Sequence, residues 1–254
     1  MARRKKARFQ RYRLWIALGM LAVAFGCWLY YLHHEVRFVY TDAFGIGIPS
    51  DFSIQGIDIS RYQGHIDWGQ VRAMHADTVH ISFVFIKATE GISGQDGRFR
   101  QNWISARKTG LICGAYHFFY STRDPILQAK NFEDQVHLNP GDLPPVLDIE
   151  VSNDQPDSAI RSSAMSWLRE IQKHYGVTPM IYTNVRFYDR HLGPEFDRYP
   201  LWVSHFFAAW LPNPGRQWTF WQHSQGGHVN GISAPVDFNV FNGDSLDLRN
   251  LCLP

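Results

Sequence analysis

Eight apolar, strand-like runs that alternate with helical patterns restrict the fold of this chain more than any other feature. Helical periodicity connects the first five runs, near residues 67–75, 98–109, 125–137 and 157–175. Alternating strands and helices indicate parallel pairing, and 254 residues fit one barrel. We therefore predict an α/β fold, a modified TIM-like β/α barrel with an incomplete helical ring. Its expected strands are 54–60, 79–88, 112–119, 144–150, 179–184, 201–206, 218–223 and 236–241.

The fourth run, residues 144–150, closes with two carboxylates two positions apart. Side chains alternate along a strand, so Asp148 and Glu150 share a face and lie about 6.6 Å apart along the chain. Like charges this close raise the pKa of one partner and leave the other ionised. This arrangement suits a catalyst that protonates one oxygen while holding negative charge near a developing positive charge. A helix N-cap or an ion-paired strand end is the alternative.

Acidic side chains also occur on two other expected strands. Asp58 lies in the first strand and Asp237 in the last. Because barrel sites form at the C-terminal ends of the strands, we expect Asp58, Asp148, Glu150 and Asp237 to converge on one rim.

Eight motifs in order carry a family resemblance: GIDISRYQG, FVFIKATEG, GAYHFFYS, PPVLDIE, IYTN, LWVSHF, FWQHS and PVDFNVFNG. Over residues 53–245 the chain resembles glycoside hydrolase family 25, the Chalaropsis-type lysozymes. The resemblance implies cleavage of the β-1,4 bond between N-acetylmuramic acid and N-acetylglucosamine in peptidoglycan. It matches the family's acidic positions to the four acids named above. Ser204 and His205 depart from the residues of many relatives, which affects a subsite rather than the chemistry.

The resemblance and the physical argument together assign roles. Glu150 is the expected general acid, and Asp148 is expected to stay ionised or to orient the acetamido group of the substrate. Asp58 and Asp237 would orient these groups, the sugar or the attacking water. The resemblance implies net retention, with the acetamido group as a candidate internal nucleophile.

Eight further residues are candidates for binding the substrate, although core packing is an equal alternative for each aromatic one. Lys87 is expected to pair with Glu90 or another acid of the rim. No metal-ligand spacing or phosphate-binding loop is present in the sequence, so we expect no metal and no cofactor. The candidates are Tyr62, Lys87, Glu90, Tyr116, Phe118, Tyr182, Trp202 and Gln222.

The N-terminus predicts a membrane anchor. Residues 1–13 hold seven Lys or Arg and no acid, and residues 14–32 are uncharged and long enough to cross a bilayer. The positive-inside rule keeps the basic tail in the cytoplasm and places the rest outside the cytoplasmic (inner) membrane as a single-pass protein. A cleaved signal peptide, with Ala22-Val23-Ala24 as its site, is the alternative. Residues 33–52 are expected to form a linker and residues 53–254 the single catalytic domain.

Partners and competing functions follow from the same reasoning. Without its tail the chain is net acidic, so we expect glycan strands of peptidoglycan and no nucleic acid as partners. The sequence sets no oligomeric state. A disulfide between Cys113 and Cys252 is conceivable, but two free thiols are favoured. The alternative functions are a non-catalytic peptidoglycan-binding module and a hydrolase of another amino-sugar polymer, such as chitin.

Overall fold

The computed structural model describes residues 15–29, 35–206 and 210–254. The chain divides into two compact units, of which the larger comprises Phe38–Ala208 and Pro212–Pro254. In the smaller unit, residues 15–29 are helical. No helix of the described residues is long and apolar enough to span a membrane. Residues 14 and 30–32 of the expected anchor lie outside the described residues.

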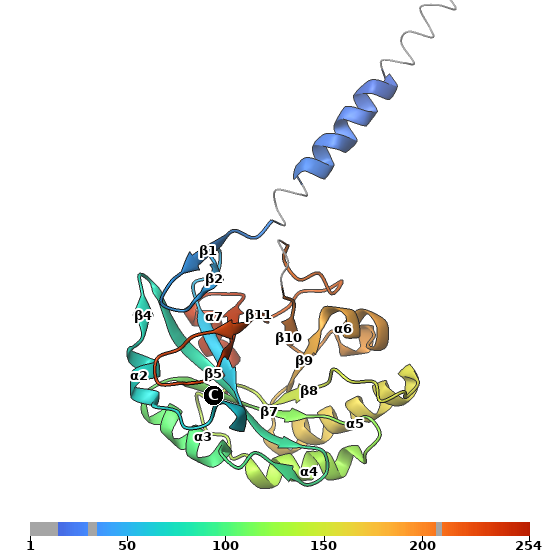
Figure 1. The fold of residues 1–254 in the computed structure, drawn as a ribbon. Coiled ribbons are helices and arrows are strands. Elements are labelled where there is room, and N and C mark those ends of the chain that lie inside the picture. Colours follow the sequence, from blue (N-terminus) through green and yellow to red (C-terminus); the bar gives the residue numbers. More distant parts are fainter. Residues whose placement is uncertain (1–14, 30–34, 207–209) are drawn as a thin grey trace, which may run out of the picture. The chain divides into compact units, whose positions relative to one another are not determined.

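The larger unit is built around the predicted barrel of eight strands (Figure 1). The barrel closes because the first of these strands pairs with both the second and the last. The strands are β3 (Gln55–Ile59), β5 (Val79–Glu90), β7 (Ile112–Phe118), β8 (Val146–Asp148), β9 (Met180–Asn184), β10 (Leu201–Ser204), β11 (Phe220–Gly227) and β12 (Val236–Phe241).

Parallel pairing, which the alternation of strands and helices indicates, does not extend to the last strand. The strands from β3 to β11 pair in parallel, whereas β12 is antiparallel to both β11 and β3. The physical reason is the connection between Gly227 and Val236, because a parallel crossover needs about a dozen residues or more. The N-terminal end of β12 therefore meets the C-terminal ends of the other strands.

The helices confirm the incomplete ring around the barrel. The four expected helices are α2 (Trp68–Ala73), α3 (Phe99–Lys108), α4 (Pro125–Gln135) and α5 (Asp157–Tyr175), and the last three lie outside the strands in Figure 1. Gly176 ends α5 in a left-handed conformation with φ 71°, as a C-terminal glycine does. The short helices α6 (Val185–His191) and α7 (Ser245–Leu251) were not expected from the sequence.

Part of the expected linker 33–52 is a β hairpin. Strands β1 (Phe38–Thr41) and β2 (Ile46–Pro49) pair in antiparallel register. Between them Phe44 is 0% exposed, and its ring centroid lies 5.3 Å from that of Phe238 on β12. Burial of one large aromatic side chain stabilises a fold by about 1.5–3 kcal/mol, which explains why so short a hairpin is ordered. The folded unit therefore begins near Phe38 rather than at residue 53.

Aromatic rings fill the barrel interior and confine any site to the rim. Phe85 and Trp202 stack with ring centroids 4.3 Å apart. Gly56 and Gly114 make room for this packing, because a Cβ atom there would lie 2.4 Å from Phe83 and 2.5 Å from Phe85, respectively. Cys113 is a buried free thiol and Cys252 is a half-buried one, so the two are not joined.

Candidate active site

A cleft of about 280 Å³ at one rim of the barrel holds all four predicted acids, Asp58, Asp148, Glu150 and Asp237. Its volume is just below the range of about 300–1,000 Å³ that is usual for small-molecule sites. Glu90 alone among the predicted substrate-binding residues does not line the cleft. Those that do are Tyr62, Lys87, Tyr116, Phe118, Tyr182, Trp202 and Gln222.

The strand ends place these acids. Asp58 is the fourth residue of β3, and Asp148 is the last residue of β8, two positions before Glu150. Asp237 lies near the start of β12 and is the direct register partner of Asp58. This pairing depends on the antiparallel direction of β12, because in a parallel strand Asp237 would lie at the opposite rim.

Two side-chain amides fix one oxygen of Asp58. Its Oδ2 accepts hydrogen bonds from Gln222 Nε2 at 2.7 Å and from Asn239 Nδ2 at 2.8 Å. Two further hydrogen bonds, to the amide oxygens, set the orientation of both amides. Tyr182 Oη donates to Gln222 Oε1 at 2.8 Å, and Trp202 Nε1 donates to Asn239 Oδ1 at 2.7 Å. Each amide must therefore present its NH₂ group to Asp58.

Asn239 is a site residue that sequence reasoning missed. It lies two positions after Asp237 on β12, the same spacing that singled out Asp148 and Glu150. A neutral amide gives no charge signal, but this i, i+2 spacing from a predicted acid would have placed it on the same face.

The aromatic candidates differ sharply in exposure. Tyr62 is 74% exposed, whereas Trp202 is 2% exposed and Tyr182 is 9% exposed. Trp202 and Tyr182 therefore serve chiefly to hold Asn239 and Gln222, and core packing describes Trp202 better than sugar stacking does. Tyr62 and the half-buried Tyr116 and Phe118 remain the aromatic candidates for contact with a sugar at the cleft.

Burial sets the protonation of the Asp148 and Glu150 pair. Asp148 is 5% exposed, and its Oδ1 has no hydrogen-bond partner among the described residues. Burial, followed by the charge of Glu150, raises the pKa of Asp148 well above its ordinary value. Burial also raises the pKa of Glu150, which is only half-buried. The raised pKa of Asp148 opposes the expectation that this residue stays ionised in the cleft without substrate. A buried carboxylate lacks the hydration that keeps it charged.

The second pair, Asp58 and Asp237, also holds protons more tightly than free aspartate. Burial raises the pKa of Asp237 to about 6, although a hydrogen bond with Asp58 lowers it. Burial and the charge of Asp237 raise the pKa of Asp58 well above its ordinary value, against the two amide hydrogen bonds. The cleft therefore carries fewer negative charges near neutral pH than its four carboxyl groups would suggest.

Lys87 is the cation that faces these acids. As expected, it pairs with Glu90, with 2.6 Å between Nζ and Oε2. Its charge lowers the pKa of both Asp148 and Glu150. The Lys87 Nζ atom also lies 5.0 Å from the ring centroid of Phe118.

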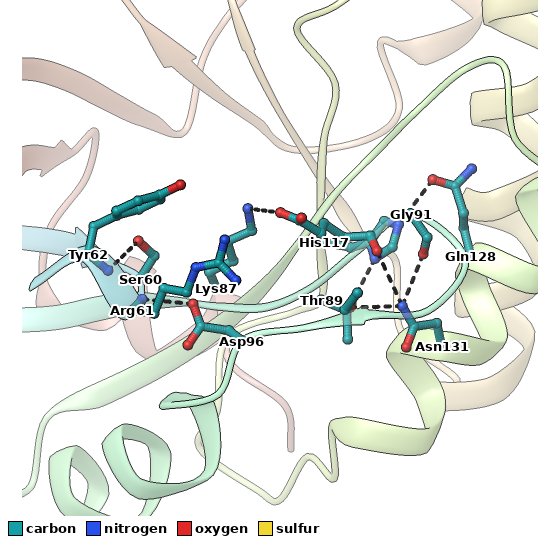
Figure 2. Close-up of polar contacts among 12 residues, drawn as sticks. Ser60, Arg61, Tyr62, Lys87, Thr89, Gly91, Asp96, His117, Gln128 and Asn131 are labelled. Atoms are coloured by element: carbon teal, nitrogen blue, oxygen red, sulfur yellow. Dashed lines mark hydrogen bonds and ion pairs between the residues drawn. The ribbon is translucent and has the colours of Figure 1, made fainter. Parts of the chain in front are cut away.

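A buried polar network holds the end of β5 that carries Lys87 (Figure 2). Asn131 Nδ2 donates to the carbonyl oxygens of Gly91 and Gly94, both at 3.0 Å. Thr89 Oγ1 and His117 Nδ1 are 2.7 Å apart, and burial lowers the pKa of His117 to about 3, so its imidazole is neutral. The network therefore orders the rim without adding charge to it.

We expect the replacement of Lys87 by Met to move the pH optimum of hydrolysis to higher pH. The lysine charge lowers the pKa of Asp148 and Glu150, so its loss raises both and shifts both limbs of the pH profile in that direction. The profile of kcat/KM for Lys87→Met measures this, with Lys130→Met, an exposed lysine on α4, as the control. An unchanged or more acidic optimum would contradict the assigned electrostatics.

The fold and the cleft together define a class of enzyme. Paired carboxyl groups with raised pKa values at the rim of an α/β barrel are the groups that cleave a glycosidic bond, one as proton donor and the other against an oxocarbenium-like transition state. The protein is a glycoside hydrolase.

Comparisons with known proteins give the family. Residues 57–232 match Glycosyl hydrolases family 25, so the chain belongs to that family. The chain is 42% identical over 207 residues to the uncharacterized protein YegX of Escherichia coli (strain K12), covering 82% of this chain and 76% of that protein. It is 34% identical over 225 residues to Lysozyme M1 of Streptomyces globisporus, covering 80% and 73%. The structure of a family 25 glycosyl hydrolase from Bacillus anthracis superposes with a TM-score of 0.74 at 29% identity, covering 87% of this chain and 99% of that one.

Proposed function

We propose that the protein is a lysozyme of the Chalaropsis type, an N-acetylmuramidase. Its substrate is the β-1,4 bond between N-acetylmuramic acid and N-acetylglucosamine in peptidoglycan. The observation that carries the proposal is the convergence of Asp58, Asp148, Glu150 and Asp237 on one cleft. The similarity to Lysozyme M1 of Streptomyces globisporus supports the choice of substrate.

In the proposed mechanism Glu150 is the general acid. It is half-buried, lines the cleft and has a raised pKa, so it combines access to the substrate with a retained proton. Its O–H protonates the bridging oxygen as the glycosidic bond breaks, and the leaving sugar departs as an alcohol. A raised pKa keeps a larger fraction of the acid form near neutral pH.

Asp148 supplies the negative charge in this mechanism. As positive charge develops at the anomeric carbon, the ionised form of Asp148 becomes favourable, and the proton shared by the pair resides on Glu150. Asp148 then stabilises that charge directly, or it accepts a hydrogen bond from the N–H of the substrate's acetamido group. In the second case the carbonyl oxygen of the same acetamido group attacks the anomeric carbon. Water opens this intermediate with net retention, and Asp58 and Asp237 orient the sugar or the water.

Mass spectrometry of muropeptides after digestion of purified cell wall tests the function. We expect soluble products with N-acetylmuramic acid at the reducing end, released first as the β anomer by NMR. Products with N-acetylglucosamine at the reducing end, or faster release of reducing ends from chitin oligomers, would contradict the proposed substrate. Binding to cell wall without clearing would support the binding-module alternative instead.

We further propose that residues 14–32 anchor the protein in the cytoplasmic membrane, with the catalytic domain outside. The support is the uncharged composition of this segment and the seven basic residues before it. Fractionation of cells that express the full chain, followed by carbonate extraction and protease accessibility, tests this location. Release of the protein by carbonate, or protection of the barrel from external protease, would contradict it.

A further inference from the structure

A second and larger cavity lies at the same rim as the catalytic cleft. It spans about 800 Å³, is widely open to solvent and is formed by the end of β9, the exposed side of α6, the end of β10 and the two residues that follow it. This volume is within the range of about 300–1,000 Å³ that is usual for ligand sites. None of the predicted catalytic or substrate-binding residues lines it.

Strand register shows that the cavity continues the cleft. Tyr182 pairs with Trp202, and two positions further along Asn184 pairs with Ser204. Both pairs face the same side of the sheet, separated by about 6.6 Å along the strands. The first pair lines the cleft and the second lines the cavity. A ligand bound in the cleft can therefore extend directly into the cavity.

The charges of the cavity differ from those of the cleft. Arg186 and Arg190 are exposed and four residues apart on α6, so they share one face of the helix. Asp189 lies on the same wall, and Val185 and Phe206 add apolar surface. The walls thus present two guanidinium groups and one carboxylate, whereas the cleft is lined by four carboxyl groups and one lysine.

We propose that this cavity binds the short anionic peptide carried by the muramic acid residues of the glycan strand. The inference rests on the proposed function, because that peptide is attached to the sugar beside the cleaved bond. Its free carboxylates match Arg186 and Arg190, which bind carboxylates in a bidentate manner, and its single ammonium group matches Asp189. Its alanine methyl groups match Val185 and Phe206. A neutral sugar ring would offer no negative charge to either guanidinium group.

The test compares two forms of one substrate. Glycan strands with intact peptides, and the same strands after an amidase has removed the peptides, are digested by the wild type and by the double variant Arg186→Gln/Arg190→Gln. We expect the double variant to lose roughly tenfold or more in kcat/KM on the intact strands, because two charge-assisted contacts are lost. On the stripped strands it should match the wild type.

Arg169→Gln is the matched control, because it removes an exposed arginine from α5, outside the cavity. It should behave as the wild type on both substrates. An equal loss on both substrates, or no loss on intact strands, would overturn peptide binding in the cavity. Failure of the proposed function looks different, since the wild type would then cleave neither form.

Discussion

Replacing Glu150 with Gln is expected to lower kcat on peptidoglycan by about a thousandfold, while KM and Tm change little. General acid catalysis contributes about 10²–10⁴ to a rate, and glutamine keeps the shape of the side chain without a proton to donate. Its partial burial and raised pKa make Glu150 the accessible proton donor of the cleft. Turbidity assays over a range of cell-wall concentrations measure kcat and KM, and thermal unfolding of the purified variant measures Tm.

A substrate with a better leaving group tests whether the loss of activity in Glu150→Gln is a loss of proton donation. An aryl glycoside with a good leaving group needs little protonation, so Glu150→Gln should be impaired far less on it than on peptidoglycan. Glu133→Gln is the control, since burial also raises the pKa of Glu133, which lies on α4 and pairs with His174. Near-normal turnover of peptidoglycan by Glu150→Gln would refute the assignment, and so would an equal loss on both substrates.

Replacing Asp148 with Asn is expected to have opposite effects on activity and stability. Activity should fall by roughly a hundredfold to a thousandfold, as when one preorganised electrostatic group is removed from a transition state. The free energy of unfolding at neutral pH should rise, because Asp148 is buried and its Oδ1 has no hydrogen-bond partner in the part of the chain that the structure describes. Each kcal/mol gained corresponds to about 2–4 °C in Tm for a chain of this size.

The pH dependence of this stability gain has a definite sign. The folded-state pKa of Asp148 is raised, so its contribution to stability is complete below the unfolded pKa and is lost as pH rises through the folded pKa. The Tm of the wild type should therefore fall more steeply with rising pH than that of Asp148→Asn, and the two should converge near pH 4. A lower Tm for the variant at neutral pH, or activity within tenfold of the wild type, would contradict this role.

Much of the barrel was predictable because its strands are marked in the sequence. Apolar runs alternate with amphipathic helices, and the long connections of the first half force parallel pairing. The short connection from Gly227 to Val236 indicates antiparallel pairing for β12 instead. The hairpin of β1 and β2 was not predictable from local pattern, since its order depends on Phe44 packing against a strand almost two hundred residues away.

For the site, the acids were predictable and their protonation was not. Charged residues at strand ends carry a signal in sequence, and all four acids reached the same cleft. Burial and partner geometry exist only in the folded chain, so the strong effect of burial on Asp148 was invisible beforehand. The same holds for Asn239, whose importance comes from a hydrogen bond to Asp58 rather than from its own charge.

Titration of the glutamate carboxyl carbons by ¹³C NMR tests the central claim most directly. The signal of Glu150 is identified as the one that is missing from the Glu150→Gln spectrum. We predict that the pKa of Glu150 lies above the ordinary glutamate value of 4.5. A general acid needs this raised pKa, because it must keep its proton until it donates it to the bridging oxygen. A Glu150 signal that titrates at or below 4.5 would contradict the account.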